Sequence, residues 1–281
     1  MAIDSASHQE SVAIIVAPNG ARKTKQEHRN LPMTTEELVA EARACQSAGA
    51  AMTHLHARDV NGKHSLEIED NDPIYHAVKE AVGDKMIVQL TTEAVGQYSP
   101  QQQIALIKAV RPEAASFALR ELIPNDSSEK EARDFFHWVA ENNILSQMIL
   151  YDEADIERYF QYRRSGVLPN HNQHALVVLG RYHKEQQSSP WDLRGLNLER
   201  FKQEDIRCAV CAFGARELDC LISAMLLGLD VRVGFENNHL DASGRLAESN
   251  TTQVQALSNM SRLLNVPLDD ACRFRTSIFS L

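Results

Sequence analysis

The stretch that decides the fold runs from Val12 to His56. It contains an apolar run, VAIIVAP (12–18), then TTEELVAEARACQSAGA (34–50), and then a second apolar run, AMTHLH (51–56). The middle segment begins with a threonine suited to cap a helix and ends near a glycine suited to stop one. The order strand, helix, strand is typical of a parallel βαβ unit rather than of a hairpin.

The same alternation continues along the rest of the chain. Further β-rich runs follow at KMIVQLTT (85–92), AASFAL (114–119), LSQMILY (145–151), ALVVLG (175–180), RCAVCAF (207–213) and LDVRVGF (229–235). The segments between them carry helix signals, for example SPQQQIALIKAV (99–110) and SSEKEARDFFHWVAEN (127–142). Eight such strands alternating with helices predict an α/β fold, the (β/α)8 TIM barrel.

A doubly wound open sheet shares this alternation and is the competing fold. It normally carries a glycine-rich phosphate loop, G-x-G-x-x-G, after its first strand. Here that position reads APNGARKTKQ (17–26), which lacks the pattern, so the barrel is favoured. We expect an N-terminal tail over 1–10 and one catalytic barrel domain over 11–281, in which the polar stretch 183–195 forms an active-site loop.

Composition narrows the class of function. The chain has 281 residues, of which 43% are hydrophobic, enough for a large core. A net charge of −9 disfavours a nucleic-acid binder and favours a small-molecule partner. The sequence has no apolar run of about eighteen residues and no signal-like N-terminus, so we expect a soluble, cytoplasmic protein without membrane contact. The five cysteines lie in apolar stretches, as reduced thiols do.

The signal for a metal site lies at the ends of two strands. His54 and His56 close AMTHLH, and residues two apart on a strand point to the same face. Glu236 follows LDVRVGF, and barrel closure brings the eighth strand beside the first and near the second. Two imidazoles and a carboxylate that leave one position open predict a catalytic zinc, with manganese or iron as alternatives. Taken alone, the two histidines are also compatible with polar strand ends bonded to loops.

Arg232 shares the strand parity of Glu236, so its guanidinium is expected to point into the barrel below the metal. Such an arginine favours binding of a carboxylate or enolate oxygen, and the alternative is a structural ion pair with another inward acid. Four other histidines lie in polar stretches and are expected to be exposed: His28, His171, His174 and His183.

An ordered set of motifs resembles a known family. APNGAR (17–22), NLPMT (30–34), AGAAMTHLHARD (48–59), VRVGFENN (231–238) and AESN (247–250) resemble the β-keto acid cleavage enzymes, whose type member is the 3-keto-5-aminohexanoate cleavage enzyme. The resemblance spans nearly the whole chain. It implies a zinc-containing barrel, usually a homotetramer, that converts a β-keto acid and acetyl-CoA into acetoacetate and a new acyl-CoA.

The resemblance also implies roles for single residues. The zinc ligands and the active-site arginine of the family correspond to His54, His56, Glu236 and Arg232. Thr91 stands where the family has a catalytic serine, and Ser116 where it has a threonine. In the implied chemistry, zinc chelates the keto acid and a carboxylate base forms the enolate. The enolate then attacks the acetyl thioester, CoA is transferred, and a retro-Claisen step releases acetoacetate.

Three positions depart from the family pattern. Arg22 stands where members usually have a glutamate after the N-G-A turn, whose Asn19 is a candidate for binding substrate. Asn237 stands where they have the aspartate base, and a neutral amide cannot accept the proton. The sequence TTEAVG (91–96) replaces a glycine-rich turn and places Glu93 at the rim of the barrel.

These departures leave two interpretations open. Either Glu93 has become the base or an extra metal ligand, or the condensation is lost and the site treats a related acid differently. Arg22 and Arg120, at the rims of the first and fourth strands, favour a substrate with a second anionic group. A metal-dependent hydrolase of the amidohydrolase type is disfavoured, because the expected strands five and six carry no histidine. A non-catalytic barrel that binds keto acids is the third class.

Overall fold

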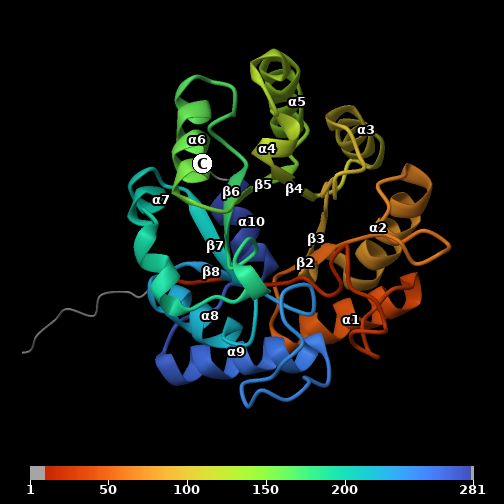
Figure 1. The fold of residues 1–281 in the computed structure, drawn as a ribbon, viewed down its shortest axis with the longest axis vertical. Coiled ribbons are helices and arrows are strands. Elements are labelled where there is room, and N and C mark those ends of the chain that lie inside the picture. Colours follow the sequence, from red (N-terminus) through yellow and green to blue (C-terminus); the bar gives the residue numbers. More distant parts are fainter. Residues whose placement is uncertain (1–9, 280–281) are drawn as a thin grey trace, which may run out of the picture.

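The computed structural model describes residues 10–279. Within that range eight parallel strands close into a barrel, surrounded by helices (Figure 1). The strands are β1 (Ile14–Val16), β2 (Met52–Leu55), β3 (Ile87–Leu90), β4 (Ala114–Ala118), β5 (Leu145–Leu150), β6 (Gln173–Leu179), β7 (Arg207–Ala212) and β8 (Asp230–Val233). Strand β8 pairs with β1, with Ile15 opposite Arg232. The predicted TIM barrel is therefore confirmed, and the open sheet is excluded.

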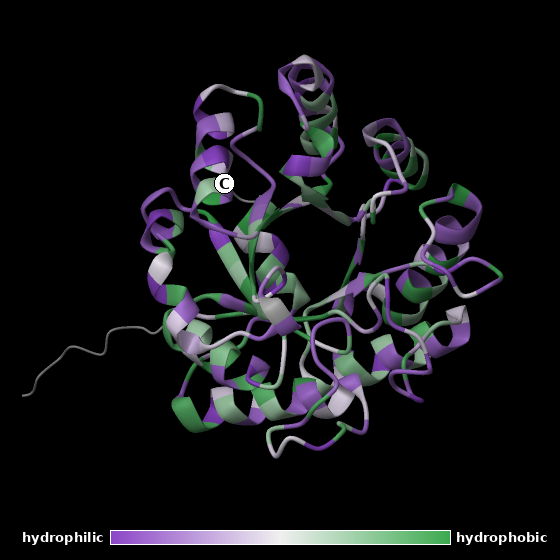
Figure 2. Cartoon of the chain, viewed as in Figure 1, coloured by the Kyte–Doolittle hydropathy of each residue, from purple (hydrophilic) through white to green (hydrophobic). Residues whose placement is uncertain are grey.

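Helices follow the strands around the barrel. They are α1 (Thr35–Ala48), α2 (Ile68–Val82), α3 (Pro100–Val110), α4 (Leu119–Leu122), α5 (Glu129–Glu141), α6 (Glu153–Arg164), α7 (Glu199–Gln203), α8 (Glu217–Leu226), α9 (Asn250–Leu264) and α10 (Ala271–Phe279). Short 3-10 turns are η1 (Gly83–Lys85), η2 (Asp126–Ser128), η3 (Lys184–Gln186) and η4 (Pro190–Gly195). Figure 2 shows hydrophobic and hydrophilic residues together on most helices, as expected for helices that cover a barrel.

The helix signals in the sequence correspond to real caps. The Thr34 side chain accepts a hydrogen bond from Glu37 N, and the Glu37 carboxylate accepts one from Thr34 N, which together form a capping box at the start of α1. Gly49 ends the helix with φ 110°, in the left-handed region. Ser99 caps α3 in the same way, directly before Pro100. The ends of these helices are thus set by local chemistry.

The apolar core has two layers. Outward-facing strand residues such as Val16 and Val88 pack against the helices, whereas Ile15 and Met52 belong to the cluster that fills the barrel. Phe274 of α10 joins this inner cluster and lies against the beginnings of the strands. Among the described residues, the N-terminal end of the barrel is therefore filled, which leaves the C-terminal end as the place for a ligand.

Two histidines that were expected to be exposed are buried, so that prediction is wrong for them. Strand β6 begins at Gln173, earlier than expected, and therefore includes His174, whose Nε2 lies 3.0 Å from Asp230 Oδ2. The His28 ring packs 4.2 Å from the Phe235 ring, and its Nε2 lies 2.9 Å from the Ala247 carbonyl oxygen. His171 and His183 are exposed as expected.

Most of the expected N-terminal tail, residues 1–9, lies outside the described residues. Glu10 is described, and its Oε2 lies 2.9 Å from Lys202 Nζ. The expected active-site loop, 183–195, contains η3 and η4. No helix of residues 10–279 combines the length and the apolar character needed to cross a membrane.

Candidate metal centre

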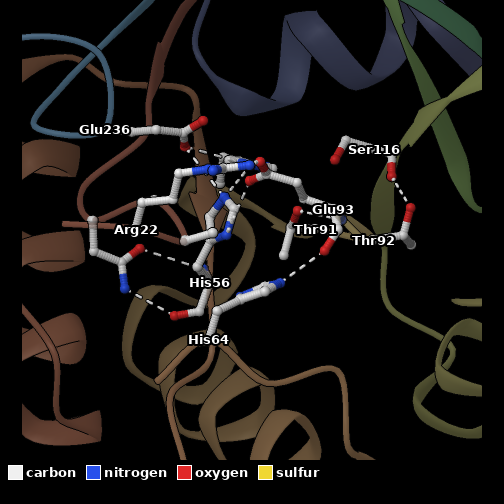
Figure 3. Close-up of polar contacts among 12 residues, drawn as sticks. Arg22, His56, His64, Thr91, Thr92, Glu93, Ser116 and Glu236 are labelled. Carbon is white, nitrogen blue, oxygen red and sulfur yellow. Dashed lines mark hydrogen bonds and ion pairs between the residues drawn. The ribbon is translucent and has the colours of Figure 1, made fainter. Parts of the chain in front are cut away.

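The three metal candidates of the sequence meet at the C-terminal end of the barrel. His54 lies in β2, His56 follows this strand, and Glu236 follows β8. The Nε2 atoms of His54 and His56 are 3.1 Å apart. Glu236 Oε2 lies 3.3 Å from His56 Nε2 and 3.7 Å from His54 Nε2 (Figure 3). These side chains form the one group in the described part of the chain that offers three ligand atoms within 4.8 Å of one another.

Two glycines allow Glu236 to reach the histidines. At Gly234, with φ 142°, an added Cβ would lie 2.3 Å from the Ala17 carbonyl oxygen. At Gly20, with φ 64°, a Cβ would lie 2.6 Å from Glu236 Cγ. Because a side chain at either position would push the segments after β1 and β8 apart, the close approach depends on both glycines.

Neighbouring amides orient the His54 ring and hold the His56 backbone. His54 Nδ1 lies 2.7 Å from Gln89 Oε1, an oxygen that can only accept, so Nδ1 carries the proton and Nε2 keeps its lone pair. The Asn19 side chain donates to the His56 carbonyl oxygen at 2.8 Å and accepts from His56 N at 3.3 Å. Asn19, expected to bind substrate, therefore holds the His56 backbone in place.

The charges of the cluster suit a cation. Burial lowers the pKa of His54 to about 3, so this imidazole is neutral at physiological pH. Burial alone would raise the pKa of Glu236, but the Arg232 guanidinium and the two imidazoles hold it well below its usual range. A neutral imidazole and an ionised carboxylate are the forms in which these groups bind metals.

A divalent metal fits these residues. Glu236 Oε2 is buried, and within residues 10–279 nothing donates a hydrogen bond to it. It faces the two imidazole Nε2 atoms, so one cation can contact all three atoms. Two nitrogens and one oxygen suit zinc, and also manganese or iron.

Arg232 forms an ion pair, which is one of the two roles that the sequence left open, and it also borders the cavity next to the histidines. It is buried, and its Nη2 donates to Glu236 Oε1 at 3.0 Å and to Asn237 Oδ1 at 3.3 Å. The Asn237 side chain is buried as well, and its amide oxygen accepts the hydrogen bond from Arg232.

A cavity of about 30 Å³ lies against the metal cluster, and Thr91, Glu93, Arg181 and Arg232 line it together with the three candidate ligands. Glu93 Oε2 lies 4.0 Å from His56 Nδ1, on the side of the ring that faces away from Glu236, and Glu93 is not part of the metal-ligand group. A larger cavity of about 450 Å³ lies between α8, α9 and residues 238–248, and none of the three candidate ligands lines it.

Sequence reasoning missed three residues around the site. Arg181, after β6, places Nη2 3.2 Å from Glu93 Oε1. His64 Nε2 lies 2.8 Å from the Glu93 carbonyl oxygen, and its ring lies 5.2 Å from the His56 ring. Gln89 lies opposite His54 in the β2–β3 register. A polar residue inside an apolar strand was the available signal for Gln89, and no pattern marked the other two.

The other residues that the sequence predicted for the site differ in their position relative to the cavity. Thr91 Oγ1 accepts a hydrogen bond from Glu93 N at 3.0 Å and borders the cavity. The Ser116 hydroxyl is buried and has no partner in the described range. Arg120 pairs with Asp155, and its guanidinium lies 4.5 Å from the centre of the Tyr151 ring. Arg22 is exposed, with its Nε 4.0 Å from Glu93 Oε1.

Similar folds occur among solved structures. The apo structure of ObcA aligns with a TM-score of 0.70 and 18% identity, over 89% of this chain and 65% of that chain. A ternary complex of ObcA with a C4-CoA adduct and oxalate aligns with a TM-score of 0.67 and 18% identity, over 90% of this chain and 68% of that chain. Likeness at this identity concerns the fold alone.

Sequence comparison identifies relatives of this chain and its family. A 3-keto-5-aminohexanoate cleavage enzyme of Acetoanaerobium sticklandii is 27% identical over 268 residues, which cover 92% of this chain and 94% of that protein. The enzyme of the same name from Fusobacterium nucleatum subsp. nucleatum is 26% identical over 260 residues, with coverages of 91% and 93%. The family model described as beta-keto acid cleavage enzyme matches residues 11–278. Because that match spans the whole barrel, the chain belongs to the beta-keto acid cleavage enzyme family.

Proposed function

We propose that this chain is a zinc-dependent acyltransferase that condenses a β-keto acid with acetyl-CoA and yields acetoacetate and a new acyl-CoA. The observation that carries the proposal is the convergence of His54, His56 and Glu236 at the C-terminal mouth of the barrel. A β-keto acid has a keto and a carboxylate oxygen that can chelate one cation, and this cluster offers a cation site with one side facing the cavity.

Arg232 and Thr91 would orient the keto acid. The bound metal would supply Lewis-acid stabilisation of the enolate. Arg232 Nε is buried without a partner in the described residues, so this guanidinium can donate to a carboxylate or enolate oxygen that enters the cavity. The Thr91 hydroxyl accepts from a backbone N–H and keeps its own proton free to donate to the substrate.

We assign the proton-accepting role to Glu93. The carboxylates that line the cavity, among residues 10–279, are Glu93 and Glu236. Glu236 belongs to the metal cluster and is bonded to Arg232, and Asn237 is an amide that cannot take up a proton. We therefore infer that Glu93 removes the proton between the keto and carboxylate carbons.

The use of coenzyme A is proposed from similar proteins. ObcA, which has a similar fold, has been solved with a C4-CoA adduct and oxalate, and with oxaloacetate. We extend the use of a CoA thioester to this chain because it belongs to a family whose members cleave keto acids. We also propose that the enzyme acts in the cytoplasm as a homotetramer, and light scattering of the purified protein tests the assembly.

The test of the proposed reaction is a product assay. Zinc-loaded protein is incubated with acetyl-CoA and a panel of β-keto acids, and acetoacetate and the new acyl-CoA are measured by mass spectrometry. We expect both products from wild type and a loss of at least about a hundredfold in the rate for Glu93→Gln, since general bases contribute factors of this order. Glu131→Gln, at an exposed glutamate of α5, is the matched control and should keep the wild-type rate.

Two outcomes would contradict the proposal. Zinc-loaded protein that forms neither product from any keto acid would leave a metal-binding barrel without the condensation. Product formation that Glu93→Gln leaves unchanged would remove Glu93 from the role of base, while the reaction itself would stand.

A further inference from the structure

The cavity beside the metal cluster is too small for a keto acid as it stands. Its volume of about 30 Å³ suffices for one or two water molecules. Pockets that hold a small organic ligand usually measure roughly 300 Å³ or more. A keto acid held wholly inside this cavity therefore requires that a lining side chain move.

Glu93 is the lining side chain best placed to move. Its backbone is held at both ends, because its N–H donates to Thr91 Oγ1 and its carbonyl oxygen accepts from His64 Nε2. Its side chain is partly exposed, with 22% of its surface accessible. Rotation of this side chain enlarges the cavity that Glu93 lines without disturbing β3.

The Glu93 carboxylate now sits between two arginines and the metal cluster. Oε1 lies 3.2 Å from Arg181 Nη2 and 4.0 Å from Arg22 Nε, whereas Oε2 faces His56 Nδ1 at 4.0 Å. Figure 3 shows Arg22 and Glu93 reaching toward each other above His56. The structure therefore already holds a carboxylate in a place where a ligand anion would meet two guanidinium groups.

Arg181 is the arginine built into the cavity. It follows β6 and Gly180, and only 19% of its side-chain surface is accessible. Its guanidinium lies 5.1 Å from the centre of the Phe213 ring, which limits its freedom. Within residues 10–279 its acidic partner is Glu93. Arg120 differs, because Asp155 already neutralises it.

The geometry points to Arg181 as the residue that selects the substrate, by binding a second carboxylate at the far end of a β-keto acid. On binding, this carboxylate replaces Glu93 as the partner of Arg181, and the Glu93 side chain turns away from the guanidinium. The substrate class is then a β-keto dicarboxylic acid. This inference rests on the proposed function, since it takes the metal cluster as the site of the keto acid head.

The charge balance favours an anionic tail over a cationic one. Within 4.0 Å of the Glu93 carboxylate, Arg181 and Arg22 carry two positive charges against its one negative charge, while Glu121 lies nearby without an ion pair to either arginine. An ammonium group at this place would meet the two guanidinium groups, whereas a carboxylate completes the pairing. A keto acid with an apolar tail also displaces Glu93 but offers Arg181 no new acidic partner, so it gains nothing from this guanidinium.

A pair of probes of equal length tests the inference. 3-Oxoadipate ends in a carboxylate and 3-oxohexanoate in a methyl group, and both have six carbons and the same β-keto acid head. Calorimetry with zinc-loaded protein, fresh probe and no acetyl-CoA gives both dissociation constants. We expect wild type to bind 3-oxoadipate at least about tenfold more tightly, because a charge-assisted pair is worth roughly this factor or more.

Variants of Arg181 test whether this residue causes the preference for 3-oxoadipate. In Arg181→Met the ratio of the two affinities should fall about tenfold, and Arg181→Lys should keep part of it. Glu93→Gln should bind 3-oxoadipate more tightly than wild type, since the carboxylate that competes for Arg181 is gone. Arg133→Met, at an exposed arginine of α5, is the matched control and should keep the wild-type ratio. Zinc content measured on each variant shows whether the site has folded.

Two results would overturn the inference: wild type with no preference for 3-oxoadipate, or folded Arg181→Met and Arg181→Lys that both retain the wild-type ratio. The readout is binding in the absence of acetyl-CoA, so it separates the inference from the reaction. A preference lost in Arg181→Met without any condensation activity would keep the inference and remove the proposed reaction. Condensation activity without a preference for 3-oxoadipate would keep the proposed reaction and remove the inference.

Discussion

At the scale of single residues, Gln89 sets the tautomer of His54. Its Oε1 accepts the Nδ1 proton at 2.7 Å and leaves Nε2 free toward the metal cluster. Gln89→Leu keeps the volume but removes this acceptor, so the affinity for zinc should fall by roughly ten- to a hundredfold. Titration against a competing chelator measures the change. Gln255→Leu, at an exposed glutamine of α9, is the control, and an unchanged affinity in Gln89→Leu would refute the role.

The residue scale also shows how far the sequence could lead. His54, His56 and Glu236 could be predicted because strand alternation and barrel closure, two regular features, bring them together. Arg181 could not, because its contact with Glu93 depends on the paths of two irregular segments, after β6 and after β3. His64 lies in an irregular segment as well, and its bond goes to a backbone oxygen.

At the scale of elements, the close approach of the segments after β1 and β8 depends on Gly234. Gly234→Ala would place a Cβ 2.3 Å from the Ala17 carbonyl oxygen at φ 142°, so one segment must shift. We expect lower stability in urea and a loss of zinc binding, since Glu236 is carried by the shifted segment. Gly195→Ala, where a Cβ meets nothing within 4 Å, is the control. Full zinc binding in a stable Gly234→Ala would contradict the dependence of the site on this close approach.

Helix α8 begins with Glu217, a buried acid. Burial raises the pKa of Glu217 to about 8, above the 4.5 of an ordinary glutamate. The folded protein favours the protonated form of Glu217. The stabilisation that this form gives to the folded state is therefore complete below about pH 4.5 and is lost as the pH rises to about 8. Between about pH 5 and 8, the unfolding free energy of wild type relative to Glu217→Gln should therefore fall by on the order of 1 kcal/mol per pH unit.

Denaturant unfolding of wild type and Glu217→Gln at several pH values checks this prediction. The difference between the two proteins is the relevant quantity, because buried histidines such as His54 have lowered pKa values and contribute to the pH dependence of both. Glu131→Gln, at an exposed glutamate, should follow wild type at every pH. A constant difference between wild type and Glu217→Gln would show that Glu217 does not titrate in this window.

The elements themselves could be predicted from the sequence except at some of their ends. Each of the eight apolar runs contains or overlaps a strand, because β-branched and apolar residues in short runs are typical of buried parallel strands. The start of β6 was misjudged, since Gln173 and His174 look like loop residues. In the fold, Gln147 and Asp230 provide hydrogen-bond partners for His174 inside the barrel, and these partners are distant in sequence.

At the scale of the whole molecule, α10 fills the N-terminal end of the barrel. Phe274 is fully buried in the inner cluster, and its ring lies 5.3 Å from that of His174. Phe274→Ala should cost roughly 3–5 kcal/mol in the free energy of unfolding, measured with urea. Leu263→Ala, at a residue of α9 that is 75% exposed, should cost less than about 0.5 kcal/mol. Equal costs would show that α10 does not close the barrel.

Closure of the barrel connects the fold to the site. The sequence predicted eight parallel strands, and the pairing of β8 with β1 is what brings Glu236 to His54 in β2 and to His56 just after it. The departures at Arg22, Glu93 and Asn237 were visible in the sequence, but their arrangement was not. In the structure Asn237 accepts from Arg232, while Glu93 lies between Arg22, Arg181 and His56.

The central claim is that His54, His56 and Glu236 hold one divalent metal ion. The most direct measurement is the metal content of the purified protein, by elemental analysis after removal of free metal, for wild type and for Glu236→Gln and His56→Ala. The account predicts about one zinc per wild-type chain, and a large loss in both variants while circular dichroism shows an intact barrel. Metal-free wild-type protein that does not take up zinc, or folded variants that retain it, would contradict the account.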